Sequence, residues 1–339
     1  MTTTSIGEDA GTAGAPNRAA TPEDLRLALR AATLYYLDGL TQAEIASRLG
    51  VSRPTAGRLV ARAKANGIVR IDIVVPPDLR DDLHADEERE LERRFGLTEA
   101  VVAGHGVDVG APGRPAAFAS VGRAAAALLM RRLAPEDVLG FTWGPEQVAV
   151  ATALTPGVAS CRTVVQLDGA MSTAAYQTGT EFILSRCADV FRASTIRLPA
   201  PLYADASTVA SMRSDSVISR TLEAGRRADM MLFGVGAAST STTLFEGSYL
   251  DTRMLDELVS LGAVGEIGGR FFDAKGTPVE TELQQRAVSV PLEDVRGCAK
   301  TLLISSGVAK YHATLGALRG QLARLLVCDI DCAHWLLAQ

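Results

Sequence analysis

The sequence predicts a mixed α/β protein, in which a helical amino-terminal domain precedes a doubly wound parallel-sheet domain. Two observations predict this fold. Apolar residues recur at helical spacing up to Ala63, whereas from residue 99 onward short apolar segments alternate with glycine turns and amphipathic helices. The chain of 339 residues, 47% hydrophobic and 22% charged, also holds enough material for about two globular domains.

The first two helices are marked by the residues at their ends. Apolar residues at helical spacing predict a helix over residues 23–38, and Gly39 is the glycine expected just after its end. Thr41 and Glu44 then form a capping-box pattern, in which each side chain bonds the backbone N–H group of the other residue. A short second helix should therefore run to Leu49.

A turn and a third helix follow. Gly50 and Val51 have the length of the turn in a helix-turn-helix pair. Ser52 is a favourable N-cap for the next helix, and Pro54 is tolerated in its first turn. The apolar residues of this helix can face inward, and its outward face would carry Arg53, Thr55, Arg58, Arg62 and Lys64.

Charge is distributed unevenly along the chain. Residues 21–75 hold eight basic and five acidic residues, a net charge of +3, whereas residues 76–339 have a net charge of −7. No acidic residue lies between Glu44 and Asp72. A charged helix face is often only a solvated surface, but surface helices normally mix signs, so we predict a recognition helix that contacts operator DNA. The residues assigned to DNA contact are Thr41, Gln42, Ser52, Arg53, Pro54, Thr55, Arg58, Arg62 and Lys64.

The boundaries of the domains follow from these patterns. Residues 68–75 alternate and are rich in β-branched residues, which predicts a strand that closes the DNA-binding domain. A highly charged helix with an apolar stripe is expected over residues 79–95. We predict a disordered tail at 1–20, a helix-turn-helix DNA-binding domain at 21–75, a linker helix at 76–98 and an effector-binding domain at 99–339.

The carboxy-terminal domain repeats one pattern, a short apolar strand followed by a glycine-bearing turn and a helix. Such alternation predicts a parallel sheet that is covered by helices on both faces. Ligands of such sheets bind outside the carboxyl ends of the strands. The strands expected are Ala100–Ala103, Val138–Thr142, Thr163–Leu167, Met230–Gly234, Thr301–Ser305 and Arg324–Cys328.

Polar residues collect where these strands end. They occur at Thr142–Gly144, Gln166–Gly169, Gly234–Gly236 and Ser305–Gly307, with Lys310 one turn into the next helix. Exposed N–H groups, hydroxyls and a lysine near helix starts favour an anion, so we predict a phosphorylated small ligand. A dinucleotide is not expected, because the glycine pair at 234 and 236 lacks the third glycine of that fingerprint.

The remaining composition excludes several classes of protein. The five cysteines form no Cys-x-x-Cys pair and have few histidines near them, so we expect free thiols, no metal and no cofactor. No apolar run approaches the roughly 20 residues of a membrane helix, and the first twenty residues lack the pattern of a signal peptide. We therefore expect a cytoplasmic protein without a membrane partner.

At this point the sequence resembles the SorC family of bacterial transcriptional regulators, from about residue 25 to the end. The motifs that carry the resemblance are spread in order over both domains, and as a set they are specific. They are Leu34-Tyr-Tyr-Leu-Asp-Gly-Leu-Thr-Gln-Ala-Glu-Ile-Ala, Gly50-Val-Ser-Arg-Pro-Thr, Gly140-Phe-Thr-Trp-Gly, Gln166-Leu-Asp-Gly, Leu198-Pro-Ala-Pro, Gly265-Glu-Ile-Gly-Gly-Arg-Phe-Phe-Asp and Leu315-Gly-Ala-Leu-Arg-Gly.

The resemblance implies a sugar-binding domain similar to glucosamine-phosphate and ribose-phosphate isomerases, used as a sensor in a homotetramer. It also implies two ligand segments that the residues alone do not suggest. Phe271–Asp273 looks like a core aromatic pair that ends a strand, and Tyr249–Asp251 looks like a helix N-cap. The effector-binding residues expected are Thr142, Trp143, Gly144, Gln166, Asp168, Gly169, Tyr249, Asp251, Phe271, Asp273, Ser306, Gly307 and Lys310.

The sequence departs from the family's pattern at three places. Ser306-Gly307 stands where a glycine pair is usual, Gly57 replaces a bulkier residue of the recognition helix, and the stretch Cys328–Cys332 stands where a Thr-Asp-Glu type is commoner. The first departure bears on how the ligand is seated. The second bears on the operator sequence, and a glycine within a helix also costs about 1 kcal/mol relative to alanine.

These observations predict a regulator of a carbohydrate or polyol catabolic operon, which is not an enzyme. Asp168 and Asp273 would bond sugar hydroxyls, and Lys310 with the Thr142–Gly144 turn would hold a phosphate. The alternative is an active phosphosugar isomerase or aldolase that carries a DNA-binding module. Asp168 and Lys310 are the candidates for its base and its Schiff-base lysine.

Overall fold

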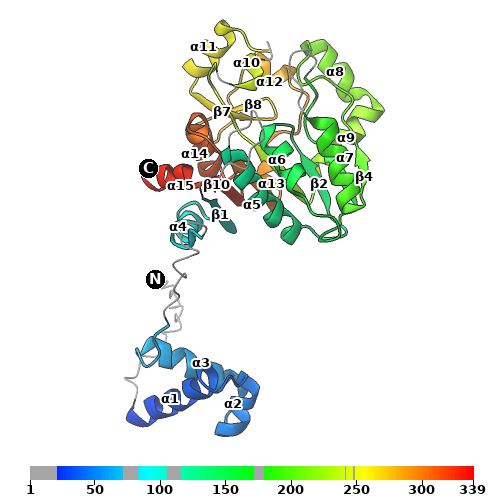
Figure 1. Cartoon of the computed structure of the whole chain (residues 1–339). Coiled ribbons are helices and arrows are strands. Elements are labelled where there is room, and N and C mark those ends of the chain that lie inside the picture. The colour runs from blue at the N-terminus through cyan, green and yellow to red at the C-terminus, as the bar shows by residue number, and fades with distance from the viewer. Residues whose placement is uncertain (1–20, 72–82, 105–115, 172–178, 241, 247–248) are drawn as a thin grey trace, which may run out of the picture. The chain divides into compact units, whose positions relative to one another are not determined.

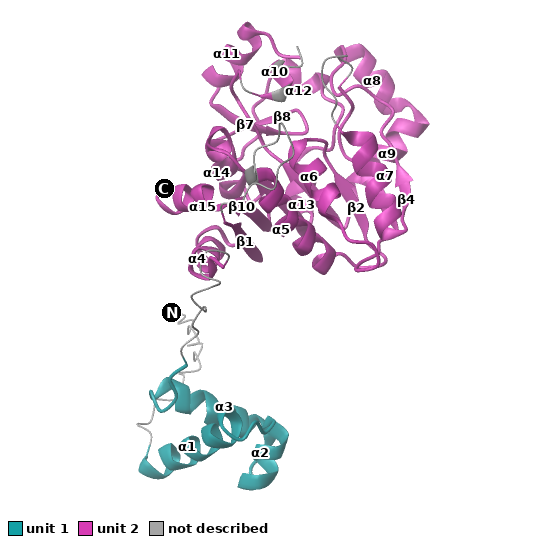
Figure 2. Cartoon of the chain, viewed as in Figure 1, with its two compact units in different colours: residues 1–74 teal, residues 75–339 magenta. Residues whose placement is uncertain are grey.

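The computed structural model describes residues 21–71, 83–104, 116–171, 179–240, 242–246 and 249–339. Contacts divide the chain into two compact units, Met1–Val74 and Val75–Gln339 (Figure 2). Each unit has hydrophobic clusters of its own. None of the described helices is both long enough and apolar enough to cross a membrane.

The first unit is a bundle of three helices, α1 (Pro22–Tyr36), α2 (Gln42–Leu49) and α3 (Arg53–Ala65) (Figure 1). The predicted capping box of α2 is confirmed. The backbone N–H of Thr41 donates to Oε2 of Glu44 at 2.8 Å, and the N–H of Glu44 donates to Oγ1 of Thr41 at 3.4 Å. Gly50 ends α2 at φ 67°, a left-handed conformation that favours glycine, and Ser52 caps α3 as expected.

The strand predicted over residues 68–75 is not present in its described part. Residues 68–71 adopt no strand conformation, and residues 72–75 lie outside the described residues. The described part of the first unit is helical and provides no strand with which this segment could pair. A lone strand leaves its backbone groups without partners, so alternation of residues was insufficient for the prediction.

The second unit contains a parallel sheet of seven strands in the order β1-β10-β9-β5-β2-β3-β4. The six predicted strands are confirmed, with ends that differ by at most two residues. The short edge strand β4 was not predicted. The strands are β1 (Glu99–Ala103), β2 (Val138–Phe141), β3 (Thr163–Gln166), β4 (Ser194–Ile196), β5 (Met230–Gly234), β9 (Lys300–Ser305) and β10 (Leu325–Asp329).

Helices cover both faces of this sheet and produce two separate cores. One core receives side chains from α5 (Ala116–Arg132), α6 (Pro145–Ala153) and α7 (Thr180–Phe191). The other core receives them from α4 (Ala85–Phe95), α13 (Leu292–Gly297), α14 (Tyr311–Arg319) and α15 (Ile330–Leu337). This arrangement matches the doubly wound sheet that the sequence predicts.

A second sheet of three antiparallel strands lies beside the main one. It consists of β6 (Gly236–Ala237), β7 (Ala263–Ile267) and β8 (Arg270–Asp273) (Figure 1). This sheet was not predicted from the sequence; its first strand, β6, has only two residues, and β7 and β8 are joined through Gly268 and Gly269. Around it and the main sheet lie α8 (Ala206–Ser214), α9 (Ser216–Arg226), α10 (Thr243–Glu246), α11 (Thr252–Ser260), α12 (Glu282–Arg286) and the 3-10 helix η2 (Val308–Lys310).

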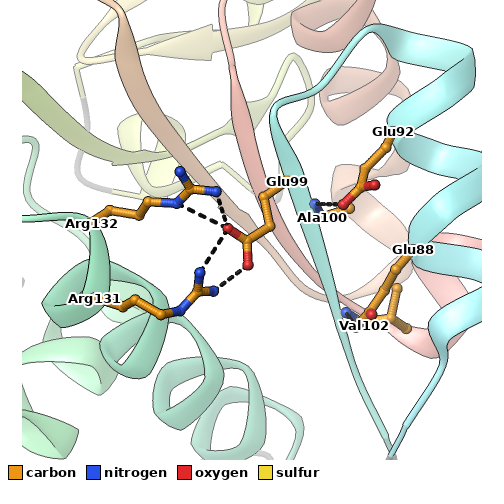
Figure 3. Close-up of polar contacts among 7 residues, drawn as sticks. All are labelled: Glu88, Glu92, Glu99, Ala100, Val102, Arg131 and Arg132. Carbon is orange, nitrogen blue, oxygen red and sulfur yellow. Dashed lines mark hydrogen bonds and ion pairs between the residues drawn. The ribbon is translucent and has the colours of Figure 1, made fainter. Parts of the chain in front are cut away.

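Helix α4 packs on the edge of the main sheet and satisfies the free side of β1. Oε1 of Glu92 accepts the N–H of Ala100 at 3.0 Å, and Oε1 of Glu88 accepts the N–H of Val102 at 3.0 Å (Figure 3). These two N–H groups point away from β10, so an edge strand that could pair with another chain is covered. Leu91 on the same helix is fully buried. The described part of the predicted linker segment is therefore integral to the second unit.

Candidate functional site

Helix α3 points its apolar residues into the first unit and its basic residues outward, as predicted. The buried residues are Ala56, Leu59, Val60 and Ala63. Arg58 is exposed on the opposite side of the helix, and its guanidinium donates to the Thr55 hydroxyl at 3.1 Å. Arg62 lies 3.4 Å from Asp24 of α1. Because α3 itself contains no acidic residue, its exposed face is cationic.

The other residues assigned to DNA contact are all exposed. They are Thr41, Gln42, Ser52, Arg53, Pro54 and Lys64. The hydroxyls of Thr41 and Ser52 serve as helix caps. A Cβ atom at Gly57 would lie 3.2 Å from Oε1 of Gln42 at the start of α2. Because Gln42 is an exposed, flexible side chain, it could move aside, and close packing does not require the glycine.

A cavity lies at the carboxyl ends of β2, β3 and β5, where a ligand of a parallel sheet is expected. Five of the predicted effector residues line it, namely Thr142, Trp143, Gly144, Asp168 and Lys310. The other lining residues are Pro145, Glu146, Gln147, Gly234, Val235, Gly236, Ala237, Thr242, Glu266, Gly268, Gly269 and Ala309.

Two glycines make room for side chains in this cavity. Gly144 caps α6 at φ 152°, and a Cβ there would lie 2.6 Å from Oε1 of Gln147. A Cβ at Gly234 would lie 3.3 Å from Nε2 of Gln147 and 3.5 Å from Oε2 of Glu146. Since Gly144 provides no side-chain cap, the first N–H groups of α6 have no side-chain acceptor at that position.

Three carboxyl groups line the cavity, of which those of Glu146 and Asp168 are buried and that of Glu266 is partly exposed. Glu146 is 2% exposed and forms an ion pair with the ammonium group of Lys310. Oε2 of Glu266 accepts the N–H of Gly269 at 2.7 Å, and Oδ1 of Asp168 accepts the N–H of Trp143 at 3.3 Å. Burial raises the pKa of the Asp168 carboxyl well above its ordinary value, and burial also raises the pKa of Glu266.

Two polar side chains of the cavity are buried without a hydrogen-bond partner. Both amide atoms of Gln147 and the hydroxyl of Thr242 lack one among the described residues. Gln147 is 1% exposed and Thr242 is 3% exposed, so neither reaches bulk water. A buried polar group without a partner costs about 1–3 kcal/mol. These atoms are suited to receive hydrogen bonds from, and donate them to, a polar ligand.

Some of the predicted effector residues serve the protein itself. Gln166 is buried, and its amide donates to the carbonyl of Asp168 at 2.6 Å and accepts the N–H of Leu198 at 3.2 Å. The carbonyl of Gly169 accepts the indole N–H of Trp143 at 2.8 Å. Both residues thus shape the loop after β3 without lining the cavity.

The two segments that only the resemblance implies, Tyr249–Asp251 and Phe271–Asp273, also lie outside the cavity lining. Asp251 caps α11 by accepting the N–H of Met254 at 2.8 Å, and Tyr249 packs 5.7 Å from the ring of Tyr203. Phe271 is fully buried in an apolar cluster. Asp273 accepts the N–H groups of the turn that follows β8, at 2.8 and 2.9 Å.

The loop before Lys310 is held by a bond to the neighbouring strand. Ser306 is buried, and the N–H of Gly307 donates to Oδ2 of Asp329 at 2.9 Å. Oδ1 of the same carboxylate accepts the N–H of Cys332 and so caps α15. Neither Ser306 nor Gly307 lines the cavity, but their loop positions Lys310, which does.

Sequence reasoning missed four polar residues of the cavity. Glu146 and Gln147 look like an ordinary first helical turn, Thr242 lies in an irregular segment, and Glu266 appears only within a motif of the resemblance. The one local signal was Gly144, because a glycine at an N-cap leaves the following N–H groups open. Nothing in the sequence places these residues next to Lys310.

Another hollow of the second unit lies at the amino ends of the strands. Several of its charged residues form ion pairs with one another, because Lys300 bonds Asp137 at 2.7 Å and Arg226 lies 3.4 Å from Asp294. The described residues also contain no group of three or more His, Cys, Asp or Glu side chains that could hold a metal. The cavity beside Gln147 is therefore the better candidate for a ligand site.

Comparison with known proteins agrees with this architecture. Residues 82–338 match the family model described as "Putative sugar-binding domain", and residues 30–66 match "Sigma-70, region 4". The chain is 31% identical over 315 residues to the deoxyribonucleoside regulator of Bacillus subtilis, covering 93% of this chain and 98% of that protein. It is 28% identical over 320 residues to the sorbitol operon regulator of Klebsiella pneumoniae, covering 93% and 98%. The chain belongs to the SorC family of sugar-binding transcriptional regulators.

One solved structure of a SorC-family protein covers nearly the whole chain. The full-length sorbitol operon regulator of Klebsiella pneumoniae matches with a TM-score of 0.67 at 27% identity, covering 93% of this chain and 99% of that one. The resemblance and the fold class predicted from the sequence are thus confirmed. Because these relatives are transcriptional regulators, this SorC-family chain is also a regulator and not the isomerase or aldolase considered above.

Proposed function

We propose that the chain is a ligand-responsive regulator of a carbohydrate or polyol catabolic operon. Helix α3 would read the operator, and a sugar or polyol would bind in the cavity of the second unit. The effector would act by having unequal affinity for the DNA-competent and DNA-incompetent arrangements of the protein. The single observation that carries the effector half is the buried amide of Gln147, which faces the cavity without a hydrogen-bond partner.

The cationic face of α3 supports the DNA half of the proposal. The basic residues of this face, Arg53, Arg58, Arg62 and Lys64, are exposed. The helix follows the short capped helix α2 and a turn in which Gly50 adopts a left-handed conformation. That geometry suits a recognition helix in a major groove. The homotetramer that the family resemblance implies belongs to the same proposal, because paired subunits can bind paired half-sites. Sedimentation of the full chain with and without operator DNA tests this assembly.

The polar lining of the cavity supports a sugar-like effector. The carboxylates, hydroxyls and amide that line it can bond several hydroxyl groups. A phosphorylated effector is expected from the sequence, and the features in favour of that form are Lys310 and the start of α6. The property of the cavity that distinguishes free from phosphorylated effectors is the partner of Lys310, which is Glu146.

A thermal-shift panel of the full chain against free and phosphorylated sugars and polyols tests the effector half. A compound at about a hundredfold its Kd adds about 2.7 kcal/mol to the stability of the folded state. We expect at least one compound to raise the melting temperature. The Gln147→Leu variant should keep or raise the melting temperature without ligand, because it removes an unpartnered buried amide, and should lose the response to the compound. If no compound shifts the wild-type protein, the effector half of the proposal is wrong.

A further inference from the structure

We propose that Glu146 occupies the anion position of the cavity, so that the effector is an uncharged sugar or polyol and not a phosphate ester. The inference rests on the proposed effector site and specifies the class of molecule that binds there. It starts from the position of Glu146, which is the second residue of α6. Its carboxylate therefore stands where the helix start would otherwise attract a ligand anion.

The only cation of the cavity lining is already paired. Among the described residues that line the cavity, Lys310 is the one basic residue, and its ammonium group bonds the carboxylate of Glu146. Glu146 is 2% exposed and Lys310 is 22% exposed at the side chain, so this pair is largely shielded from water. A phosphate would have to displace a buried carboxylate from its partner. Separating such a pair leaves an uncompensated buried charge, which is strongly unfavourable.

The other carboxyl groups of the cavity give an anion no counter-charge. Asp168 and Glu266 line the same cavity, so three acidic side chains share it with one lysine. Burial raises the pKa of both groups and favours their uncharged forms, so neither carries a charge that could replace Lys310 as the partner of an anion. The two acids are also held by backbone N–H groups, of Trp143 and Gly269, which fixes them in the cavity.

The free polar groups of the cavity match hydroxyls. The amide of Gln147 offers one donor group and one acceptor without a partner, and the Thr242 hydroxyl offers both functions. A sugar or polyol hydroxyl donates one hydrogen bond and accepts others, so adjacent hydroxyls can satisfy both atoms of the amide. A phosphate dianion only accepts, so it would leave Oε1 of Gln147 without a donor.

The test uses inorganic phosphate as the probe, with calorimetric titration of the full-length protein. Wild type should show no saturable phosphate binding in the millimolar range. Glu146→Gln frees Lys310 and keeps the size of the side chain, and it should gain a phosphate site at least about tenfold tighter than any in wild type. Glu146→Thr serves as the second variant if Glu146→Gln does not fold. Glu266→Gln is the matched control, and it should gain less because it leaves Glu146 on Lys310.

The same proteins are then compared by thermal shift with ribose and glucitol and with the phosphate esters of these compounds. The inference is supported if the wild type responds to free compounds of this class and Glu146→Gln acquires a response to phosphate or its esters. Phosphate binding by the wild type that matches that of Glu146→Gln would overturn it, as would the absence of any gain in both Glu146 variants. A wild-type response restricted to phosphate esters would overturn the inference and leave the effector half of the proposed function standing. A wild type that responds to no compound of the wider panel removes the proposed effector function and this inference with it.

Discussion

The exposed face of α3 and the cavity of the second unit are built in opposite ways. The exposed face of α3 is made by residues close together in sequence, and the caps beside it join residues three positions apart, such as Thr41 with Glu44 and Ser52 with Thr55. The cavity joins distant residues, and the pair of Glu146 with Lys310 spans 164 positions. The exposed face of α3 depends on the three helices of the first unit, whereas the cavity depends on the whole sheet of the second unit being assembled.

The largest expected effect tests whether the two units are stable independently. Phe141 is fully buried at the end of β2, just before the Thr142–Gly144 turn. Phe141→Ala should lower the free energy of unfolding of the second unit by about 3–5 kcal/mol, because it leaves a cavity in the core. Both tryptophans, Trp143 and Trp335, lie in the second unit, so their fluorescence in urea reports its unfolding.

In that variant the first unit should keep its own stability. The helical circular dichroism that remains after the second unit has unfolded reports the unfolding of the first unit. Leu29→Ala is the control, since Leu29 is half-exposed on α1 and its loss should change stability by less than about 0.5 kcal/mol. An equal loss of stability in both units of Phe141→Ala would contradict the separation drawn here.

A second prediction concerns the cationic surface. Arg58→Ala should weaken operator binding about 10- to 100-fold, which corresponds to about 1–3 kcal/mol, because a well-placed arginine contact to a base has this value. Fluorescence anisotropy with a labelled operator measures the change. Arg89→Ala removes another exposed arginine, from α4 in the second unit, and should leave the affinity as it is. An unchanged affinity in Arg58→Ala would remove this residue from the interface.

A third prediction concerns the local caps. The Ser52 side chain accepts the N–H of Thr55 at the start of α3. Ser52→Ala should lower the stability of the first unit by about 1 kcal/mol and leave the fluorescence transition of the second unit in place. Ser211→Ala changes an exposed serine within α8 and should have a smaller effect. A shift of the second transition by Ser52→Ala would show that the units are coupled in stability.

The smallest effect concerns pH. Burial raises the pKa of Glu266 above its ordinary value of 4.5, although the Gly269 N–H group offsets part of this. Between the unfolded and folded pKa values, the folded protein binds more protons than the unfolded chain, so stability falls as pH rises through this window. Glu266→Gln should reduce that slope in the second unit only, as measured by urea unfolding at a series of pH values above 4.5. An identical slope in wild type and variant would contradict the assignment.

The sequence predicted the elements of both regions better than it predicted the cavity. The capping box, the glycine turn and the six main strands are local patterns, and the structure contains them. The three-stranded sheet was missed because β6 has two residues and β7 and β8 are joined through Gly268 and Gly269. A strand of two residues carries no periodicity that a sequence pattern could reveal.

The part of the cavity that was predicted also follows from a local pattern. Thr142, Gly144 and Lys310 follow strand ends, where ligands of parallel sheets bind, and they line the cavity. Glu146 could not be identified, because it follows β2, whereas its partner Lys310 follows β9, which lies two places away in the sheet order. Gln166, which also follows this pattern, instead bonds the backbone of its own loop and of Leu198. Sheet order and side-chain direction are settled only by packing of the complete unit.

The central claim is that occupancy of the cavity controls DNA binding by α3. The most direct measurement is the affinity of the full-length chain for an operator selected from random duplex DNA, with and without the polyol or sugar that gives the largest thermal shift. The account predicts a change of about 5- to 150-fold in operator affinity, with the same factor in effector affinity when the operator is bound. An operator affinity that stays constant at saturating effector would contradict it.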